Sequence, residues 1–350
     1  MVLKDLFINE ELTIKQAIKR LDETAHKILF ITEGNVLKGV LTDGDIRRWI
    51  LKNGKLSEKV SLIMNSNPVY VDAKDVHKTK EIMKKKMIEA IPVVNKNKEV
   101  VDVIFWHDNF EEKFKYLNEI RNPVVIMAGG KGTRLYPFTK VLPKPLIPIG
   151  DIPIIERIIN RFRDYGCCKF YLTLNYKKNM IKAYFSEIER NYEIDYIEED
   201  KPLGTVGSLY LLKKKINETF FLSNCDILID GNYSDMLRYH KENKNKITII
   251  TSLKHNVIPY GVIKLKKDGT VETIEEKPEY DFLVNTGMYI LESETIYDIP
   301  ENKFYHMTDL INYYIAKREK IGVYPISNKS WLDMGQFKEM EDMLERLGVK

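Results

Sequence analysis

The chain has 350 residues, enough for two or three domains that each bury a core. Its 55 basic and 51 acidic residues leave a net charge of +4 with no concentrated basic stripe, which argues against a nucleic-acid partner. Three cysteines without a CxxC spacing and six histidines without an HExxH pair argue against a disulfide framework and a zinc site. The start lacks signal-peptide character and no apolar run approaches about 18 residues, so we expect a cytoplasmic protein without a membrane partner.

The first 110 or so residues contain an internal repeat of helix, strand and strand. In the first copy, residues 12–18 have helical spacing, and residues 28–31 and 36–41 have the apolar pattern of short strands. The same order returns at residues 76–87, 91–94 and 100–105. One copy cannot cover its own apolar face, so we expect the two copies to pack against each other.

Residues 39–48, GVLTDGDIRR, resemble the C-terminal signature of a CBS motif, and the pair of copies resembles a tandem CBS (Bateman) module. Such modules commonly bind adenine nucleotides. The resemblance implies that the Thr42 hydroxyl and the Asp45 carboxylate hold phosphate and ribose oxygens of that ligand. In the second copy Phe105 stands in place of the threonine, which removes a hydroxyl. The alternative is a module that only dimerises or supports the structure, because a fold alone does not establish a ligand.

A different pattern begins at Pro123, after a charged, helix-prone segment. Short apolar segments alternate with amphipathic ones, which favours an α/β domain with a mainly parallel sheet and helices on both faces. The expected strands are residues 124–127, 169–175, 193–198, 220–223 and 246–252, and the expected helices are 180–190, 233–243 and 336–348. Asp268-Gly269 between two alternating runs predicts a β-hairpin over residues 264–274.

These patterns divide the chain into a tandem module and an α/β domain joined by a short linker. We expect the module at residues 1–114, with halves at about 1–57 and 58–114, the linker at 115–122 and the α/β domain at 123–350.

A glycine-rich loop, AGGKGTRL, directly follows the strand predicted at residues 124–127. Ligands of open α/β sheets bind beyond the carboxyl ends of the strands, and glycines let backbone amides approach a phosphate closely. The spacing differs from a Walker A loop, because Lys131 precedes Gly132 instead of following it. It also differs from a dinucleotide fingerprint, which would place glycine where Leu135 stands.

Together with the residues after it, this loop forms the segment AGGKGTRLYPFTKVLPKPLIPIGDIPII (Ala128 to Ile155), which closely resembles the signature of the sugar-phosphate nucleotidyltransferases. Members of this family activate hexose 1-phosphates with GTP, UTP, CTP or dTTP. The resemblance extends over residues 124–335, with further motifs in family order. It implies a Rossmann-like (GT-A-like) nucleotidyltransferase sheet for the α/β domain.

The resemblance also implies roles for individual residues. Arg134 matches the arginine on the departing pyrophosphate, and Lys144 matches the lysine on the α-phosphate, so these two are the expected catalytic cations. Asp226 and Asp333 match the two carboxylates that hold Mg²⁺ together with nucleotide phosphates. Cys225 is a departure, because many relatives have glycine there, and a thiol beside the metal ligand raises the question of oxidation.

The remaining matches concern the two ligands. The residues expected to contact the nucleotide are Ala128, Gly129, Gly130, Lys131, Gly132, Thr133, Gly204, Thr205 and Gly207. Those expected to contact the sugar phosphate are Asn175, which falls where the guanylyl-type branch carries a similar pair, Glu276 and Lys277 of an EKP motif, and Asn285 of an NTG motif.

The sequence therefore predicts an enzyme that makes an NDP-sugar and pyrophosphate. PLGTVGSL and NCDIL look most like the guanylyltransferase branch, and the fused CBS pair resembles enzymes of bacterial surface-sugar pathways. We expect GTP with glucosamine 1-phosphate or mannose 1-phosphate, in a homo-oligomer. The alternatives are a UTP-, CTP- or dTTP-dependent enzyme, and a catalytically silent nucleotide-sensing subunit.

Overall fold

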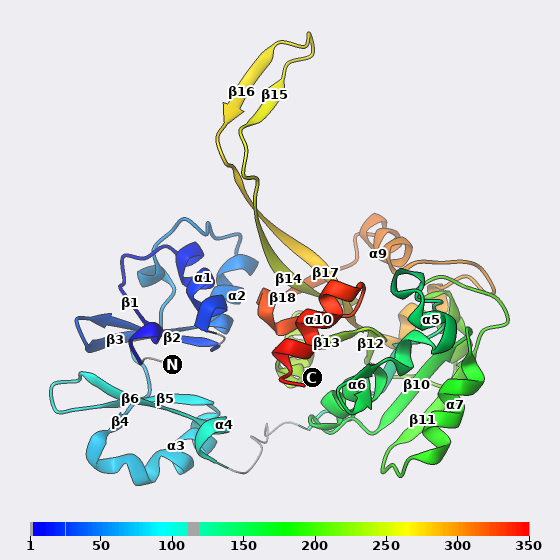
Figure 1. The fold of residues 1–350 in the computed structure, drawn as a ribbon, viewed down its shortest axis with the longest axis horizontal. Helices are drawn as coiled ribbons and strands as arrows, with labels where there is room; N and C mark the ends of the chain where they lie inside the picture. Colours follow the sequence, from blue (N-terminus) through cyan, green and yellow to red (C-terminus); the bar gives the residue numbers. More distant parts are fainter. Residues whose placement is uncertain (1–2, 25, 111–118, 350) are drawn as a thin grey trace.

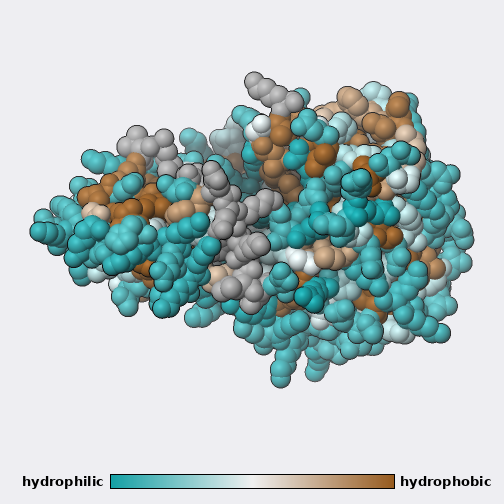
Figure 2. All heavy atoms as spheres, turned by 90° about the horizontal axis from the view of Figure 1, so that it is seen from below, coloured by the Kyte–Doolittle hydropathy of each residue, from teal (hydrophilic) through white to brown (hydrophobic). Residues whose placement is uncertain are grey.

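The computed structural model describes residues 3–24, 26–110 and 119–349, which form two α/β bodies (Figure 1). We call residues 3–110 the N-terminal module and residues 119–349 the C-terminal domain. The first four residues of the predicted linker, 115–118, lie outside the described part of the chain. Within that part, no helix combines the length and apolar character needed to cross a membrane. The face in Figure 2 is largely hydrophilic, with a hydrophobic patch over the N-terminal module.

The N-terminal module consists of two similar units. The first contains η1 (Leu3–Leu6), β1 (Phe7–Ile8), α1 (Ile14–Thr24), β2 (Ile28–Glu33), β3 (Val36–Thr42), α2 (Asp43–Leu51) and η2 (Val60–Leu62). The second contains β4 (Val71–Asp72), η3 (Ala73–Lys78), α3 (Thr79–Lys86), β5 (Ala90–Val94), β6 (Val100–Phe105) and α4 (Trp106–Asn109). Each unit has its own three-stranded sheet, in the orders β1-β2-β3 and β4-β5-β6.

The two units pack against each other, as the repeat predicts. Phe30 and Val40 of the first unit share an apolar cluster with Phe105 of the second. Backbone hydrogen bonds also cross between them, from Leu37 N to Lys98 O at 2.9 Å. Each unit thereby covers apolar surface that the other would expose to water.

The C-terminal domain is built on a seven-stranded sheet in the order β11-β10-β7-β12-β17-β14-β18. Its strands are β7 (Val124–Met127), β10 (Lys169–Leu174), β11 (Glu193–Glu198), β12 (Phe220–Asn224), β14 (Ile247–Val257), β17 (Glu279–Leu291) and β18 (Ile321–Ile326). Strands β11, β10, β7 and β12 run parallel, β17 is antiparallel to β12 and β14, and β14 pairs in parallel with β18. The mainly parallel sheet predicted from the alternation is therefore confirmed.

Apolar clusters cover both faces of this sheet. Val124 and Ile126 of β7 belong to one cluster and Val125 to the other, since successive side chains point to opposite faces. The helices are α5 (Phe138–Val141), α6 (Ile154–Arg163), α7 (Lys178–Glu187), α8 (Tyr233–Glu242), α9 (Met307–Ala316) and α10 (Phe337–Arg346). Short 3₁₀ turns are η4 (Thr133–Leu135), η5 (Lys144–Leu146), η6 (Gly207–Leu212), η7 (Ser293–Asp298) and η8 (Asn328–Ser330).

Three two-stranded ladders complete the domain. They are β8 (Pro148–Ile149) with β9 (Ile152–Pro153), β13 (Ile227–Ile229) with β19 (Trp331–Asp333), and β15 (Val262–Leu265) with β16 (Val271–Glu275). The β15–β16 hairpin is the one predicted around Asp268-Gly269. It stands at the tip of a long arm formed by the outer halves of β14 and β17, which projects away from both bodies (Figure 1).

Candidate functional site

A cleft of about 440 Å³ lies where the parallel strands of the C-terminal domain end. The glycine-rich loop follows β7, Glu199 follows β11, and Asn224 ends β12. The residues that line the cleft are Met127, Gly129, Gly130, Gly132, Thr133, Arg134, Lys144, Thr173, Glu199, Pro202, Leu203, Gly204, Thr205, Asn224, Cys225, Asp226, Phe304 and His306. The cleft therefore combines the glycine-rich loop, two cations and two carboxylates from segments far apart in sequence.

The glycine-rich loop fits tightly against the segment that carries Lys144. Gly132 has a left-handed φ of +63°, and a Cβ there would lie 3.0 Å from the Lys144 Cβ. Thr139 Oγ1 donates a hydrogen bond to the Gly132 carbonyl at 2.8 Å. A side chain at position 132 would strain the backbone and displace Lys144, so glycine is required here.

Three residues assigned to the nucleotide lie outside the cleft lining. Ala128 is buried in the core, and its amide donates to Thr173 O at 2.9 Å. Lys131 is exposed on the loop. Gly207 faces the Lys303 carbonyl, which would lie 2.7 Å from an added Cβ. The other six predicted nucleotide contacts line the cleft.

Lys144 is a buried lysine, only 7% exposed, and its ammonium is hydrogen-bonded to the Asp226 carboxylate. Desolvated cations need a compensating partner, and Asp226 supplies it. Both members of the pair line the cleft, and Lys144 lies beside the glycine-rich loop.

Asp226 and Asp333 are brought together by the β13–β19 ladder. Ile227 pairs with Asp333, and the Met334 amide donates to the Asp226 carbonyl at 2.8 Å. Burial, followed by the negative charge of Asp226, raises the pKa of Asp333. Arg134 approaches the same point, because a Cβ on Gly335 would lie 3.2 Å from one Asp333 oxygen and 3.4 Å from the Arg134 guanidinium.

This arrangement suits a divalent cation. Carboxylate oxygens are the ligands that Mg²⁺ prefers, and two neighbouring carboxylates repel each other until a cation separates their charges. Across the described ranges, no three His, Cys, Asp or Glu side chains gather in metal-binding geometry. The two aspartates would therefore hold the ion together with phosphate oxygens of a nucleotide and water.

The PLGTVG loop is fixed against the start of α9. Gly204 has φ +82°, and a Cβ there would lie 2.6 Å from the Tyr305 carbonyl. Thr205 Oγ1 accepts a hydrogen bond from the Met307 amide at 2.8 Å and lies 3.4 Å from His306 Nδ1. His306 and Phe304 thereby join the cleft wall, with ring centroids 4.7 Å apart.

Glu199 is a cleft residue that sequence reasoning missed. It is 7% exposed, follows β11, and accepts a hydrogen bond from the Leu203 amide at 3.3 Å. Burial raises the pKa of Glu199, against the opposing hydrogen bonds from Ser208 and Leu203. Its other oxygen lies 3.4 Å from the Cβ position of Gly129. Its place just after a parallel strand and before PLGT was the available signal.

Of the four residues assigned to the sugar phosphate, Asn175 lies beside the cleft. Its side-chain amide donates a hydrogen bond to the Glu199 backbone carbonyl at 3.0 Å. Glu276 and Lys277 are exposed at the base of the β15–β16 hairpin, outside the cleft lining. Their contact with a sugar phosphate stays a prediction.

The NTG motif forms a bulge at the root of the arm. Ile250 of β14 pairs with Met288, whereas Thr251 pairs with Asn285, so two residues of β17 stand unpaired between them. Gly287 has φ +89°, and a Cβ there would lie 2.4 Å from the cleft residue Asn224. Asn285 is exposed and donates to the Tyr289 hydroxyl at 2.7 Å. The motif therefore bends β17 beside the cleft, while Asn285 itself lies outside the lining.

The thiol next to Asp226 is buried in the domain. Cys225 is buried, and burial together with the charge of Asp226 raises its pKa to about 12. The thiolate is the form that oxidises, so the sensitivity suggested by the sequence is not expected in the folded protein.

Thr42 and Asp45 line a second pocket, of about 680 Å³, between the two units of the N-terminal module. Thr42 is the N-cap of α2, and its hydroxyl donates to the Asp45 carboxylate at 2.6 Å. The pair therefore has a structural role as a capping box as well as facing the pocket. Phe105 lines the same pocket and stacks on His26, with ring centroids 4.3 Å apart.

Comparison with known proteins identifies the family of each body. Residues 123–348 match the family described as nucleotidyl transferase, and residues 2–52 and 60–108 match the CBS domain. The mannose-1-phosphate guanyltransferase of Pichia angusta is 31% identical over 227 residues, covering 61% of each chain. The bifunctional protein GlmU of Methanococcus maripaludis is 35% identical over 182 residues, covering 51% of this chain and 42% of that protein. This chain thus spans less than two thirds of these curated relatives.

A solved structure is similar over the C-terminal domain. HddC from Yersinia pseudotuberculosis complexed with GMP-PN is 26% identical, with a TM-score of 0.50, over 65% of this chain and 99% of that one.

Proposed function

This chain belongs to the nucleotidyl transferase family, and from that premise we propose that it transfers the GMP group of GTP to a hexose 1-phosphate, releasing pyrophosphate. The observation that carries the proposal is the convergence of the glycine-rich loop, Arg134, Lys144 and Asp226 in one cleft. Mannose 1-phosphate is the preferred acceptor, supported by the relatives named mannose-1-phosphate guanyltransferase, and glucosamine 1-phosphate is the next. The product is a GDP-sugar for surface-sugar synthesis.

In this reaction an oxygen of the sugar phosphate attacks the α-phosphorus, and the bond from that phosphorus to the β-phosphate oxygen breaks. The attacking oxygen is already anionic, so the protein needs no general base. Its task is to align two polyanions and neutralise their charge. Backbone amides of the glycine-rich loop and the Arg134 guanidinium hold the departing pyrophosphate, and Lys144 donates to the α-phosphate.

The Lys144–Asp226 pair compensates the charge of the buried lysine before substrate binds. The Lys144 ammonium is hydrogen-bonded to the Asp226 carboxylate, which neutralises its charge. When a nucleotide enters, Lys144 turns to phosphate oxygens, and Asp226 and Asp333 become available to a divalent cation. Bound Mg²⁺ supplies charge neutralisation at the phosphates.

Glu199 supports guanine as the base. An ionised carboxylate is acceptor-only, and its two oxygens match the adjacent N1–H and N2–H₂ donors of guanine. Uracil and thymine present one N–H between two carbonyls, which would repel the carboxylate. Cytosine and adenine present an amino group beside ring acceptors. The crystal structure of HddC complexed with GMP-PN adds support for a guanine nucleotide as the substrate.

A matrix of substrates tests this proposal. Pyrophosphate release is measured with GTP, UTP, CTP and dTTP, each with mannose 1-phosphate and with glucosamine 1-phosphate. We expect turnover with GTP and loss of at least about 10²-fold in Asp226→Asn. Glu199→Gln should lower the GTP-over-UTP preference by about 10- to 100-fold, the value of a hydrogen bond to a charged group. Equal use of the four nucleotides removes the guanylyl assignment, and no turnover with any pair favours a silent sensor.

We further infer that the N-terminal module binds an adenine nucleotide. Its pocket combines apolar side chains with Lys27, Thr42, Asp45 and Arg48, which suit a base, a ribose and phosphates. Isothermal titration with AMP, ADP and ATP tests this. If none of the three binds, the module is structural.

A further inference from the structure

The arm leaves the sheet at the edge where the cleft lies. Ser223, the residue before the cleft residue Asn224, pairs with Met288, and the outer half of β17 extends beyond this point together with β14. The β15–β16 hairpin stands at the outer end and projects away from both bodies (Figure 1). A segment that starts at the rim of the cleft is therefore held away from the chain's own domains.

The hairpin has one apolar face and one mainly polar face. Residues that pair directly across a two-stranded ladder lie on the same face. One face carries Ile263, Leu265, Val271 and Ile274, and the other carries Val262, Lys264, Thr273 and Glu275. Each of the four apolar side chains on the first face is more than half exposed. A two-stranded ribbon of this kind is only marginally stable in water until another surface covers its apolar face.

Ion pairs at the base of the arm hold it in this direction. Lys15 of α1 is paired with Glu279 and lies 3.8 Å from Asp281, and His255 Nδ1 lies 2.8 Å from the same Asp281 carboxylate. The ladder of β14 with β17 reaches as far as Val257 and Glu279, with one bulge at its root. A bend that laid the hairpin over its own cleft would break this ladder or separate Lys15 from the arm.

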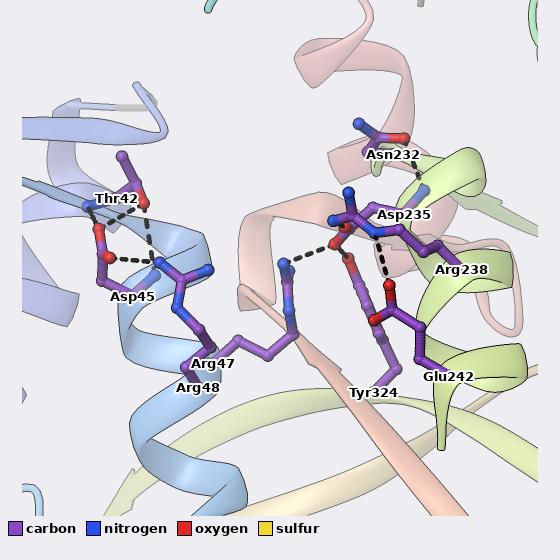
Figure 3. Close-up of polar contacts among 9 residues, drawn as sticks. All are labelled: Thr42, Asp45, Arg47, Arg48, Asn232, Asp235, Arg238, Glu242 and Tyr324. Carbon is purple, nitrogen blue, oxygen red and sulfur yellow. Dashed lines mark hydrogen bonds and ion pairs between the residues drawn. The ribbon is translucent and has the colours of Figure 1, made fainter. Parts of the chain in front are cut away.

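The module that carries Lys15 is itself fixed to the C-terminal domain. Figure 3 shows Arg47 of α2 reaching across to Asp235 of α8. The two side chains form a 2.8 Å ion pair, and the Arg47 guanidinium lies 4.2 Å from the centre of the Tyr324 ring. The Tyr324 hydroxyl donates to the same carboxylate at 2.6 Å. The arm thus contacts a module that is docked on the domain, and the surface that covers its apolar face has to come from another molecule.

The cleft has a matching apolar rim. Phe304 lines the cleft, and Phe138 follows the cleft residue Arg134 by four positions. We call Phe138, Val141 and Phe304 the cleft rim, and each of the three is more than half exposed. One chain therefore carries two uncovered apolar surfaces that do not meet each other. Two copies related by a two-fold axis would cover both surfaces reciprocally, which gives a closed pair.

The charges of the cleft favour a second copy as well. Among the residues that line it, the cations Arg134 and Lys144 stand beside the carboxylates of Glu199 and Asp226. Both cations are assigned to the nucleotide, whereas a sugar phosphate adds about two negative charges. The base of the hairpin carries an exposed lysine, Lys277. An arm from a second copy would supply the additional positive charge.

We propose that two copies of this chain exchange arms, so that the hairpin of each packs its apolar face on the cleft rim of the other and brings Lys277 to the sugar phosphate bound there. The exchange rests on the proposed function for its ligand, and goes beyond it because each cleft is then incomplete without a second copy. It also accounts for the position of Glu276 and Lys277 outside the lining of their own cleft. The two contacts are small, so we expect a Kd of about 1–10 µM for the dimer.

The first test measures the mass of the full chain by sedimentation equilibrium, without ligands, from well below to well above this Kd. We expect the native chain to change from monomer to dimer. Ile263→Glu combined with Ile274→Lys places an opposite-charge pair across the ladder, which keeps the hairpin paired but removes the apolar face, and this variant should stay monomeric. Thr273→Glu, on the other face and opposite Lys264, is the matched control and should still dimerise. A native chain that stays monomeric, or a dimer that survives in the double variant, overturns the proposal.

The second test mixes two chains that each lack one part of the exchanged site. One chain has residues 259–277 replaced by an Asn-Gly turn and keeps its cleft, and the other carries Asp226→Asn and keeps its arm. With the Asp226→Asn chain in large excess, we expect the shortened chain to recover most of the about 10-fold rise in KM for mannose 1-phosphate that loss of hydrogen bonds to a charged ligand causes. An Asp226→Asn chain that also carries Lys277→Ala should give no recovery.

The outcomes separate the exchange from the proposed function. If the native chain releases no pyrophosphate with any nucleotide, the proposed function fails, and the mass measurement still decides whether the arms mediate dimerisation. If the native chain uses GTP but the mixture shows no recovery, or recovery persists with Lys277→Ala, the partner's arm does not complete the cleft in the way proposed, and the exchange is wrong.

Discussion

Lys144 joins the chemistry of the cleft to its stability, because its ammonium is buried against Asp226. Lys144→Ala removes the cation expected on the α-phosphate and leaves a partly buried carboxylate without its partner. We expect kcat to fall by at least about 10²-fold, as when one transition-state donor is lost. Lys140→Ala, an exposed lysine four residues earlier, is the matched control and should keep native kcat. Equal losses in both variants would show that Lys144 has no special role.

Glu199 should make GTP use depend on pH. Its pKa is raised by burial, so as the pH falls the carboxyl takes up a proton earlier than an exposed glutamate does. The neutral acid loses acceptor capacity, and kcat/KM for GTP should fall as the pH drops through the raised pKa. Glu199→Gln should abolish this step in the pH profile. If the Glu199→Gln variant shows the same step in its pH profile as the native protein, the step does not belong to Glu199.

The same shift has a consequence for stability. Between the ordinary pKa and the raised one, the folded protein holds a proton that the unfolded chain releases, so stability decreases as the pH rises through that window. Above the window the penalty is complete. Glu199→Gln should therefore raise the melting temperature of the ligand-free protein at neutral pH, and a lower melting temperature would contradict a buried carboxylate held for function.

At the scale of single residues, the sequence predicted positions that belong to contiguous motifs. Gly132, Arg134 and Lys144 stand in one segment, and the structure places all three at the cleft. Glu199 was not predicted as a site residue, because in the sequence an acidic residue after a strand resembles any solvated glutamate. Its burial depends on the PLGT loop folding over it, which local pattern does not reveal.

The arm carries Glu276 and Lys277, which the family resemblance assigns to the sugar phosphate. The structure places both residues outside the cleft lining. The tip of the arm is exposed, with Tyr260 74% and Ile274 66% accessible. Replacing residues 259–277 with an Asn-Gly turn should shift the melting temperature by less than about 3 °C, because this segment adds little to the core. The junction is short, since the Ile258 amide donates to the Pro278 carbonyl at 3.0 Å.

If Glu276 and Lys277 contact the sugar phosphate during turnover, the same excision should raise KM for mannose 1-phosphate by about 10-fold or more, as expected for loss of hydrogen bonds to a charged ligand. The double variant Glu276→Gln, Lys277→Ala, with the arm intact, should reproduce this effect. Native KM in both would reject the role implied by the family resemblance.

Most elements were predictable, but their lengths were not. The strand expected at 246–252 extends to Val257, because its outer half pairs with β17 in solvent and lacks a buried face to mark it. The β13–β19 ladder was missed as a pair, since three-residue strands carry no detectable periodicity. The ladder matters because it holds Asp226 and Asp333 next to each other in the fold.

At the scale of the whole molecule, the contact between the two bodies includes the ion pair of Arg47 with Asp235. Both are largely buried, so the ion pair is worth more than an exposed one. A double-mutant cycle with Arg47→Ala and Asp235→Ala should give a coupling energy of about 1–3 kcal/mol in chemical unfolding. The exposed pair Lys38–Glu33 is the control, and an equal coupling energy in the two pairs would show that the interface is not held this way.

This interface could not be read from the sequence. Arg47 and Asp235 are 188 residues apart, and each is an ordinary charged residue of an amphipathic helix. The domain order and both folds follow from local patterns, whereas the docking of one body on the other depends on complementary surfaces. The homo-oligomeric state stays a prediction for the same reason.

The proposed reaction breaks the bond between the α-phosphorus and the β-phosphate oxygen of GTP in the cleft. The most direct measurement follows GTP labelled at the α- or the γ-phosphate during turnover with mannose 1-phosphate and Mg²⁺. We predict that the α label appears in the GDP-sugar and the γ label in pyrophosphate, with both products lost in Asp226→Asn. Release of the γ label as inorganic phosphate, or α label that never reaches the sugar, would contradict the account.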